Sequence, residues 1–165
     1  MDIEISAESG SGKINITGII EKEEFTGRGH KLTKKSSARA SVENMLTVLN
    51  KYYGIDFSKY DIHINFPSSS PVDGPSAGIA IVCGVYSAVY NAPVDCELAM
   101  TGEISISGSV RPVGGIVAKV EAAKKAGIKK VLIPSDNYRE FFADIGIEVI
   151  RSEERRVGKE CRSRW

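Results

Sequence analysis

Two stretches near the start of the chain alternate apolar and polar residues with the period of a β-strand. Acidic residues flank Ile3 and Ile5, and the segment 13–20 alternates again after the Gly/Ser run 9–12. A side-chain period of two is typical of a strand with one buried face, and a Gly/Ser run between two such strands favours a turn. We therefore expect a β-hairpin here, followed by a polar loop over 21–35.

Apolar residues farther along the chain recur at helical spacing. The clearest stripe is Val42, Met45, Leu46, Leu49, Tyr52 and Tyr53, which follow one another at intervals of three and one residues. Ser36 and Ser37 are candidate caps for the start of this helix, and Gly54 is a candidate for its end. The other predicted helices are 77–90, 116–126 and 136–143.

The remaining ordered segments have the composition of short strands. They are 62–66, the ribbon 98–110, 130–133 and 147–150. Gly102 and Gly108 are the expected turn or bulge points of the ribbon. Pro134 is expected to end the strand 130–133. Because strands and helices do not alternate strictly, the sequence predicts an α+β fold, with small mixed β-sheets and hairpins packed with about four helices.

A length of 165 residues fits a single domain, which we place at 1–150. The segment 151–165 has no apolar period and is crowded with arginine and glutamate. A common sequencing-adapter oligonucleotide can encode it in frame, so we interpret it as a non-native tail and exclude it from the fold. A natural basic tail is the alternative.

Composition excludes several classes of function. The net charge is +1, and the basic residues are scattered without aromatic residues between them, which disfavours a nucleic-acid partner. The three cysteines have no Cys-x-x-Cys spacing, so we expect neither disulfides nor a zinc site, and no metal. His30 and His63 lie in no catalytic motif. No secretory signal is expected at the N-terminus, and the expected location is the cytoplasm.

Two segments resemble motifs that their context does not support. The uncharged stretch 74–94 is long enough to test as a membrane span, but its prolines, polar residues and glycines favour a buried helix of a soluble domain. Gly10-Ser11-Gly12-Lys13 resembles the end of a nucleotide-binding P-loop. The full motif needs Gly at position 7 and Ser or Thr at position 14, where the chain has Ala7 and Ile14.

Ser76 is the first candidate for covalent chemistry. It follows Gly74-Pro75 and precedes Ala77-Gly78 at the start of a predicted apolar helix. Backbone N–H groups at a helix start can hold an oxyanion, and the helix dipole favours negative charge there. A serine that merely caps the helix is the alternative.

Lys119 is the second candidate. At about 100° per residue, Lys119 lies on the small apolar face of its helix, away from the arc that carries Glu121, Lys124 and Lys125. Burial disfavours an ammonium, and a neutral amine is the general base that a serine nucleophile needs. The alternative is a lysine whose stem packs while its charged end reaches water.

The segment Thr101-Gly102-Glu103 is the third piece. The Thr101 hydroxyl could accept a hydrogen bond from a nearby lysine and orient it. Glu103 is either a supporting residue of the site or an exposed turn residue, and the local sequence leaves both open.

Together these segments resemble the proteolytic domain of Lon-type proteases. The motif Asp73-Gly74-Pro75-Ser76-Ala77-Gly78 is similar to the family's active-site serine motif. A second block, which runs from Thr101 through 110–116 to Lys119, is similar to the block that ends in the catalytic lysine. The segments 41–44 and 131–134 continue the resemblance, which is closest to the bacterial B-type branch and covers nearly all of 2–150.

The resemblance implies the Lon protease-domain fold and a serine endopeptidase that cleaves unfolded polypeptides, with Ser76 as nucleophile and Lys119 as base. It also implies that Thr101 holds the lysine, that Asp73 lies at the mouth of the site, and that Gly74 and Ala77 support the serine. Family members form homo-hexamers and use ATP through an AAA+ module, which is absent from this sequence, so no cofactor is expected in this chain. The family's domain begins about one strand earlier and ends with a further short helix, which implies truncation at both ends. A Lon-like assembly module that does not cleave is the alternative.

Overall fold

The fold was analysed in a computed structural model, which describes residues 2–18, 22–27, 30–35, 37–67 and 74–152. The strands are β1 (Glu4–Ser9), β2 (Ile14–Thr17), β3 (Lys22–Gly27), β4 (His30–Lys35), β5 (Tyr60–Asn65), β6 (Leu98–Met100), β7 (Glu103–Ile104), β8 (Val110–Arg111), β9 (Lys130–Ile133) and β10 (Glu148–Arg151). The α-helices are α1 (Ser37–Tyr53), α2 (Gly78–Tyr90) and α3 (Ile116–Lys125). Short 3-10 helices are η1 (Phe57–Lys59), η2 (Pro75–Ala77), η3 (Ser135–Asn137) and η4 (Glu140–Asp144). The predicted α+β class is confirmed.

The first sheet corrects the predicted hairpin. Its order is β1-β5-β2, so β5 lies between the two strands that the sequence pairs with each other. β1 is antiparallel to β5, with Glu4 opposite Asn65, whereas β2 is parallel to β5, with Ile14 opposite Ile62. The alternation of apolar residues identifies both strands correctly, but it cannot say which strand is the partner.

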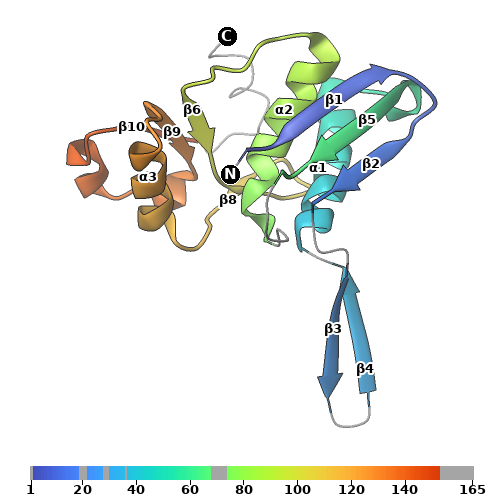
Figure 1. The fold of residues 1–165 in the computed structure, drawn as a ribbon, viewed down its shortest axis with the longest axis horizontal. Helices are drawn as coiled ribbons and strands as arrows, with labels where there is room; N and C mark the ends of the chain where they lie inside the picture. The colour runs from blue at the N-terminus through green and yellow to red at the C-terminus, as the bar shows by residue number, and fades with distance from the viewer. Residues whose placement is uncertain (1, 19–21, 28–29, 36, 68–73, 153–165) are drawn as a thin grey trace.

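The loop predicted over 21–35 is also wrong. β3 and β4 pair with each other as an antiparallel hairpin, in the register from Lys22 opposite Lys35 to Gly27 opposite His30. Figure 1 shows this hairpin running away from the rest of the fold. Apart from its glycines, Phe25 and Leu32 are the nonpolar residues of the segment, so it carries no apolar alternation from which strands could be predicted.

The larger core lies between the first sheet and helices α1 and α2 (Figure 1). The predicted stripe of α1 is confirmed: Val42, Met45 and Leu49 are fully buried, and Gly54 follows the helix with φ +68°. α2 is the predicted apolar helix over nearly the same residues. Among the described residues, no helix combines the length and apolar character that a membrane span requires.

The second sheet has the order β10-β9-β6, all parallel, and α3 packs against it. Val131 and Ile133 of β9 join Val120 of α3 and Phe142 of η4 in a smaller core. Leu132, which points to the opposite face of the strand, packs into the larger core. This sheet therefore separates two hydrophobic clusters and contributes to both.

The ribbon predicted over 98–110 is confirmed only in part. β7 and β8 form a short antiparallel ribbon whose turn contains Gly108 at φ +79°, but β6 pairs with β9 instead. The helix predicted over 136–143 is a pair of 3-10 helices, η3 and η4.

Two residues of the segment that was excluded from the fold, Arg151 and Ser152, are part of it. Arg151 is the last residue of β10, and Ser152 is 3% exposed, with its N–H donating to Ile133 O at 2.8 Å. Residues 153–165 lie outside the described part of the chain, so the proposed non-native tail stays a prediction there.

The segment that resembles a P-loop is occupied by a side chain of the protein itself. The N–H groups of Ser11 and Lys13 donate to Asp61 Oδ1 at 2.7 and 2.9 Å. These bonds hold the pKa of the Asp61 carboxyl below its usual value, and the bond from the Lys13 N–H has the larger effect. Backbone N–H groups of the kind that hold a phosphate in a P-loop therefore bind an internal carboxylate here.

Candidate active site

Ser76 lies in η2, a 3-10 helix of one turn immediately before α2. The turn is entered through Gly74, whose φ of +125° is a conformation that residues with a side chain rarely adopt. At the other end, a Cβ on Gly78 would lie only 2.7 Å from the backbone N of Ile104. Glycine at position 78 therefore lets the serine segment pack directly on the backbone of β7.

Lys119 projects from the first turns of α3. The helix begins after Gly115, which has φ +66°, and Lys119 N donates to Gly115 O at 3.1 Å. The side chain is half-buried, and this burial holds the pKa of its ammonium below the ordinary lysine value. The position on the small apolar face, predicted from the helical period, is confirmed, because Ala122, Ala123 and Ala126 line the same cleft as the lysine.

Thr101 connects the two candidates. It lies directly after β6 and is 7% exposed. Its hydroxyl donates to the backbone carbonyl of Ser76 at 3.2 Å and accepts from Lys119 Nζ at 3.4 Å. The Thr101 N–H donates to Leu132 O at 3.0 Å, which fixes the residue to β9. A single buried hydroxyl thus lies between the backbone of Ser76 and the Lys119 amine.

Ser76, Thr101 and Lys119 line one cleft of about 810 Å³. Its walls come from the start of β1, the face of α2 from Ala77 to Ala88, β6, and the small face of α3. The lining is mostly apolar and small, and its charged members are Asp2 and Lys119. An extended chain with uncharged side chains fits such a cleft better than a strongly charged ligand does.

The structure brings most of the predicted site residues together. Ser76, Ala77, Thr101 and Lys119 line the cleft, and Gly74 is two residues from the serine, whereas Asp73 lies outside the described residues. Within the described part of the chain, no hydrogen bond joins Ser76 Oγ to Lys119 Nζ, so the first link between them is the Thr101 hydroxyl.

The open question about Glu103 is decided by its partner. Glu103 Oε1 lies 3.8 Å from Arg111 Nη1 across the β7–β8 ribbon. It does not line the cleft. Glu103 is therefore a partly exposed residue of the ribbon.

Several features of the site escaped the sequence analysis. The Gly102 N–H donates to Ser76 O at 2.8 Å, and Ile79 N donates to Gly102 O at 3.2 Å, so Gly102, the residue just before β7, is bonded to the backbone of Ser76 and of Ile79. Ile3, just before β1, and Ile5 of β1 form part of the cleft wall. No local signal marks these contacts, because they join segments that lie far apart in the sequence.

A metal-dependent site has no candidate ligands in the described ranges, where no group of three or more His, Cys, Asp or Glu residues is close enough to hold an ion. Cys83 and Cys96 both line the cleft, and neither forms a disulfide within the described residues. The chemically reactive side chains of the cleft are therefore hydroxyls, two thiols, the Lys119 amine and the Asp2 carboxylate.

Comparison with known proteins gives one consistent family. Residues 1–156 match the family described as the Lon protease (S16) C-terminal proteolytic domain. The chain is 48% identical to Lon protease 2 of Bacillus subtilis over 151 residues, which are 91% of this chain and 27% of that protein. It is 48% identical over 101 residues to the archaeal Lon protease of Methanothermobacter thermautotrophicus, covering 61% of this chain and 16% of the relative.

A Lon protease of Methanosarcina barkeri is 43% identical over 133 residues, which are 79% of this chain and 15% of the relative. The chain thus spans about a quarter or less of these curated relatives. The match covers the whole described fold, including the cleft and both candidate residues. This chain belongs to the Lon family of serine peptidases, as its C-terminal proteolytic domain.

Proposed function

We propose that Ser76 is the nucleophile and Lys119 the general base of a Ser–Lys dyad that hydrolyses peptide bonds. The observation that carries this proposal is the Thr101 hydroxyl, which contacts both Lys119 Nζ and the backbone carbonyl of Ser76 within one cleft. The lowered pKa of Lys119 supports the same assignment, because a base must be neutral to accept a proton.

The reaction begins when neutral Lys119 Nζ takes the proton of Ser76 Oγ. The serine oxygen attacks the peptide carbonyl carbon, and backbone N–H groups at the start of α2 stabilise the resulting oxyanion. The intermediate then collapses, the C–N bond breaks, and the Lys119 ammonium returns its proton to the leaving amine. Neutral Lys119 next takes a proton from water, and the hydroxide attacks the acyl carbon. The bond from that carbon to Ser76 Oγ breaks, and the Lys119 ammonium returns its proton to Ser76 Oγ. No redox step or cofactor enters this sequence.

Thr101 is a positioning residue in this scheme. Its hydroxyl accepts from Lys119 Nζ, and its backbone is fixed to Leu132. A lysine has four rotatable side-chain bonds, so a fixed acceptor reduces the number of positions that its amine can occupy. The lysine is thereby held on the side of the cleft that faces Ser76.

The test is hydrolysis of an unfolded protein such as casein by the chain, compared with Ser76→Ala and with Ser87→Ala as the matched control. Ser87 also lines the cleft and lies on α2, but its hydroxyl donates to Ala92 O at 2.5 Å and is far from the start of the helix. We expect Ser76→Ala to abolish cleavage and Ser87→Ala to retain it. Equal activity in all three proteins would overturn the proposal, and an inactive parent chain would favour an assembly module that does not cleave.

For the whole protein we propose an ATP-dependent, homo-hexameric, cytoplasmic protease that degrades unfolded polypeptides in protein quality control. The family assignment and the names of the relatives support this proposal. An AAA+ module outside this chain would use the ATP, and this chain would supply the peptidase site. Co-purification of the full-length protein as a hexamer whose casein hydrolysis depends on ATP is the expected result.

A further inference from the structure

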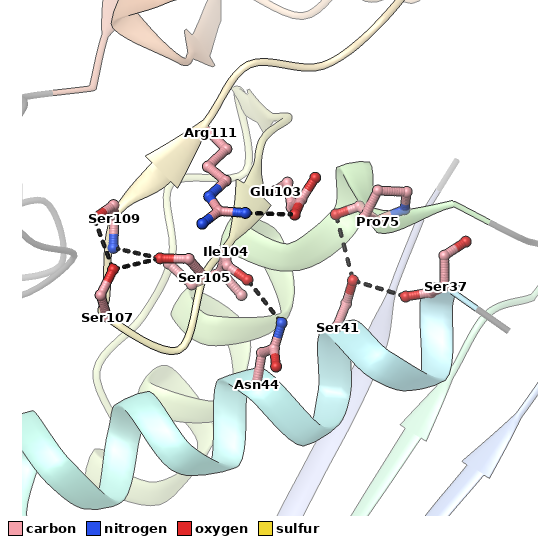
Figure 2. A network of polar contacts seen from close by, with 10 residues as sticks. All are labelled: Ser37, Ser41, Asn44, Pro75, Glu103, Ile104, Ser105, Ser107, Ser109 and Arg111. Carbon is pink, nitrogen blue, oxygen red and sulfur yellow. Dashed lines mark hydrogen bonds and ion pairs between the residues drawn. The ribbon is translucent and has the colours of Figure 1, made fainter. Parts of the chain in front are cut away.

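Helix α1 approaches the segment that carries the proposed nucleophile, residues 74–78, at Ser41. This residue is 2% exposed, and its hydroxyl lies 3.0 Å from Ser37 O on its own helix and 3.4 Å from Pro75 O (Figure 2). A serine hydroxyl has one proton, so these two carbonyls share it. Pro75 is the residue immediately before Ser76, so α1 contacts the backbone that leads directly into the nucleophile.

Asn44, one helical turn later on the same face, makes the second contact. Its Nδ2 donates to Ile104 O at 3.1 Å, as Figure 2 shows. Ile104 is fully buried in β7, and its backbone N is the atom that comes closest to Gly78. α1 therefore contacts a backbone carbonyl on each of two segments that meet at the start of α2.

Both contacts lie within a few residues of the groups that surround the carbonyl of Ser76. That carbonyl accepts from Gly102 N and from the Thr101 hydroxyl, and both donors lie just before Ile104 in the chain. We propose that Asn44, assisted by Ser41, is a positioning residue for Ser76: it holds β7 so that Thr101 and Gly102 fix the nucleophile and the lysine relative to each other. This inference rests on the proposed role of Ser76.

The alternative is that Asn44 only stabilises the packing of α1 against β7 and has no effect on the position of Ser76. The chain contains a matched case, because Asn50 on the same helix also donates its side-chain amide to a main-chain carbonyl, that of Ile55, at 2.9 Å. Ile55 is the second residue after α1 ends and does not line the cleft. A structural effect predicts similar consequences for the two asparagines, and a positioning effect predicts different ones.

The same comparison exists for the serine. Thr47 of α1 donates its hydroxyl to Glu43 O at 3.1 Å, which is the bond to the residue four positions earlier that Ser41 makes to Ser37. Thr47 has no bond to the nucleophile segment among the described contacts. Thr47→Ala is therefore the control for Ser41→Ala, and Ser41→Thr keeps the hydroxyl as a rescue.

The experiment uses the full chain and compares Asn44→Asp with Asn50→Asp, since each change replaces an amide donor with a carboxylate facing a carbonyl. The first readout is the rate at which a fluorophosphonate probe labels Ser76 in the folded protein. We expect Asn44→Asp to slow labelling about 10-fold or more, since misplacement of reacting groups by a fraction of an ångström has effects of that order. Asn50→Asp is expected to change the rate less than about 2-fold, and Ser41→Ala to slow it more than Ser41→Thr or Thr47→Ala.

The second readout is amide hydrogen exchange at Gly102 and Ile79, whose N–H groups donate to Ser76 O and Gly102 O. Faster exchange in Asn44→Asp but not in Asn50→Asp is expected, and this measurement needs no reactive serine. Equal labelling rates and equal exchange in the two variants would overturn the positioning role. Labelling that persists in Ser76→Ala would instead overturn the proposed nucleophile, and the exchange data would still decide whether Asn44 holds β7.

Discussion

The two walls of the cleft are built on hydrophobic clusters of very different size. Ser76 stands on the larger core, where α1, α2 and the β1-β5-β2 sheet contribute most of the fully buried side chains. Lys119 stands on α3, in which Val120 is the buried residue, above the small cluster of Val131, Ile133 and Phe142. The proposed nucleophile is therefore supported by the larger cluster of buried side chains, and the lysine by the smaller one.

The difference indicates how a Ser–Lys pair can be aligned without a third charged residue. A serine side chain has one χ angle, so its position depends almost entirely on the backbone, and the larger core fixes that backbone. A lysine has a long flexible side chain, and its position is fixed instead by Thr101 at the boundary between the two cores. Each prediction below perturbs one wall, or the contact between them.

The largest expected effect is that of Lys119→Arg on the wall formed by α3. The guanidinium stays protonated at all accessible pH values, so it cannot accept the serine proton, and the cleavage rate should fall by about 10³-fold or more. Lys125→Arg on the exposed face of the same helix is the control and should cleave normally. Steady-state hydrolysis of a fluorogenic peptide measures both, and a near-normal rate for Lys119→Arg would remove the lysine from its role as base.

The pH dependence of cleavage should come next in size. Burial lowers the pKa of Lys119, and only the neutral amine is reactive, so the rate should rise with pH and then level off. Below the folded pKa the rate should increase about 10-fold per pH unit, with its plateau beginning below the ordinary lysine value of about 10.4. A bell-shaped profile with a maximum near neutrality would contradict this assignment. The measurement is kcat/KM against pH on a neutral peptide.

A matched pair of valines compares the two cores directly. Val82 on α2 and Val120 on α3 are both fully buried, one in each cluster. Val82→Ala should lower the free energy of unfolding by about 2–3 kcal/mol, and Val120→Ala by about 1–2 kcal/mol, because a small cluster collapses more easily around a cavity. Urea unfolding measures both values. A larger loss at Val120 would show that the thinner wall is the more tightly packed one.

Removal of the link between the walls should have a smaller effect on stability. Thr101→Val keeps the shape of the buried side chain but leaves Lys119 Nζ and Ser76 O each without one hydrogen-bond partner. We expect a loss of about 1 kcal/mol in stability and about 10-fold in the acylation rate. Thr101→Ser, which retains the hydroxyl, should recover most of the rate. Stopped-flow labelling of the serine and thermal unfolding distinguish the two effects.

The smallest effect is expected for Glu103→Gln in the β7–β8 ribbon. Its ion pair with Arg111 spans 3.8 Å, and both side chains are partly open to solvent. The change should cost at most about 0.5 kcal/mol of stability and leave the peptidase rate within about 2-fold. A loss comparable to that of Thr101→Val would place Glu103 in the machinery of the site after all.

Features that depend on local sequence were predicted well. The helical period placed α1 and α2 within a residue or two, and the helical wheel placed Lys119 on the face of α3 that lines the cleft. Gly54 and Gly108 both have the positive φ expected at a helix end or turn. In these cases a few neighbouring residues contain the physical cause of the structure.

Features that depend on distant partners were not predicted. β1 and β2 have clear strand patterns, but the strand between them comes from residues 60–65, and no local pattern specifies that pairing. The Ser76 carbonyl is likewise held by Thr101 and Gly102, which lie about 25 positions later. The exclusion of a P-loop rested on the residues at positions 7 and 14. Its physical counterpart, the Asp61 carboxylate among the loop's N–H groups, is again a distant residue.

The position of β5 at the centre of its sheet affects how the chain leaves the ribosome. Glu4 pairs with Asn65, so neither β1 nor β2 has its partner strand until the residues of β5 have been synthesised. At about 5–20 residues per second, that interval is about 3–12 s. During it, two strands with an apolar face remain unpaired in the nascent chain, a condition that promotes aggregation. Newly made copies of this domain should therefore depend on chaperones that bind nascent chains, before the domain is itself a peptidase.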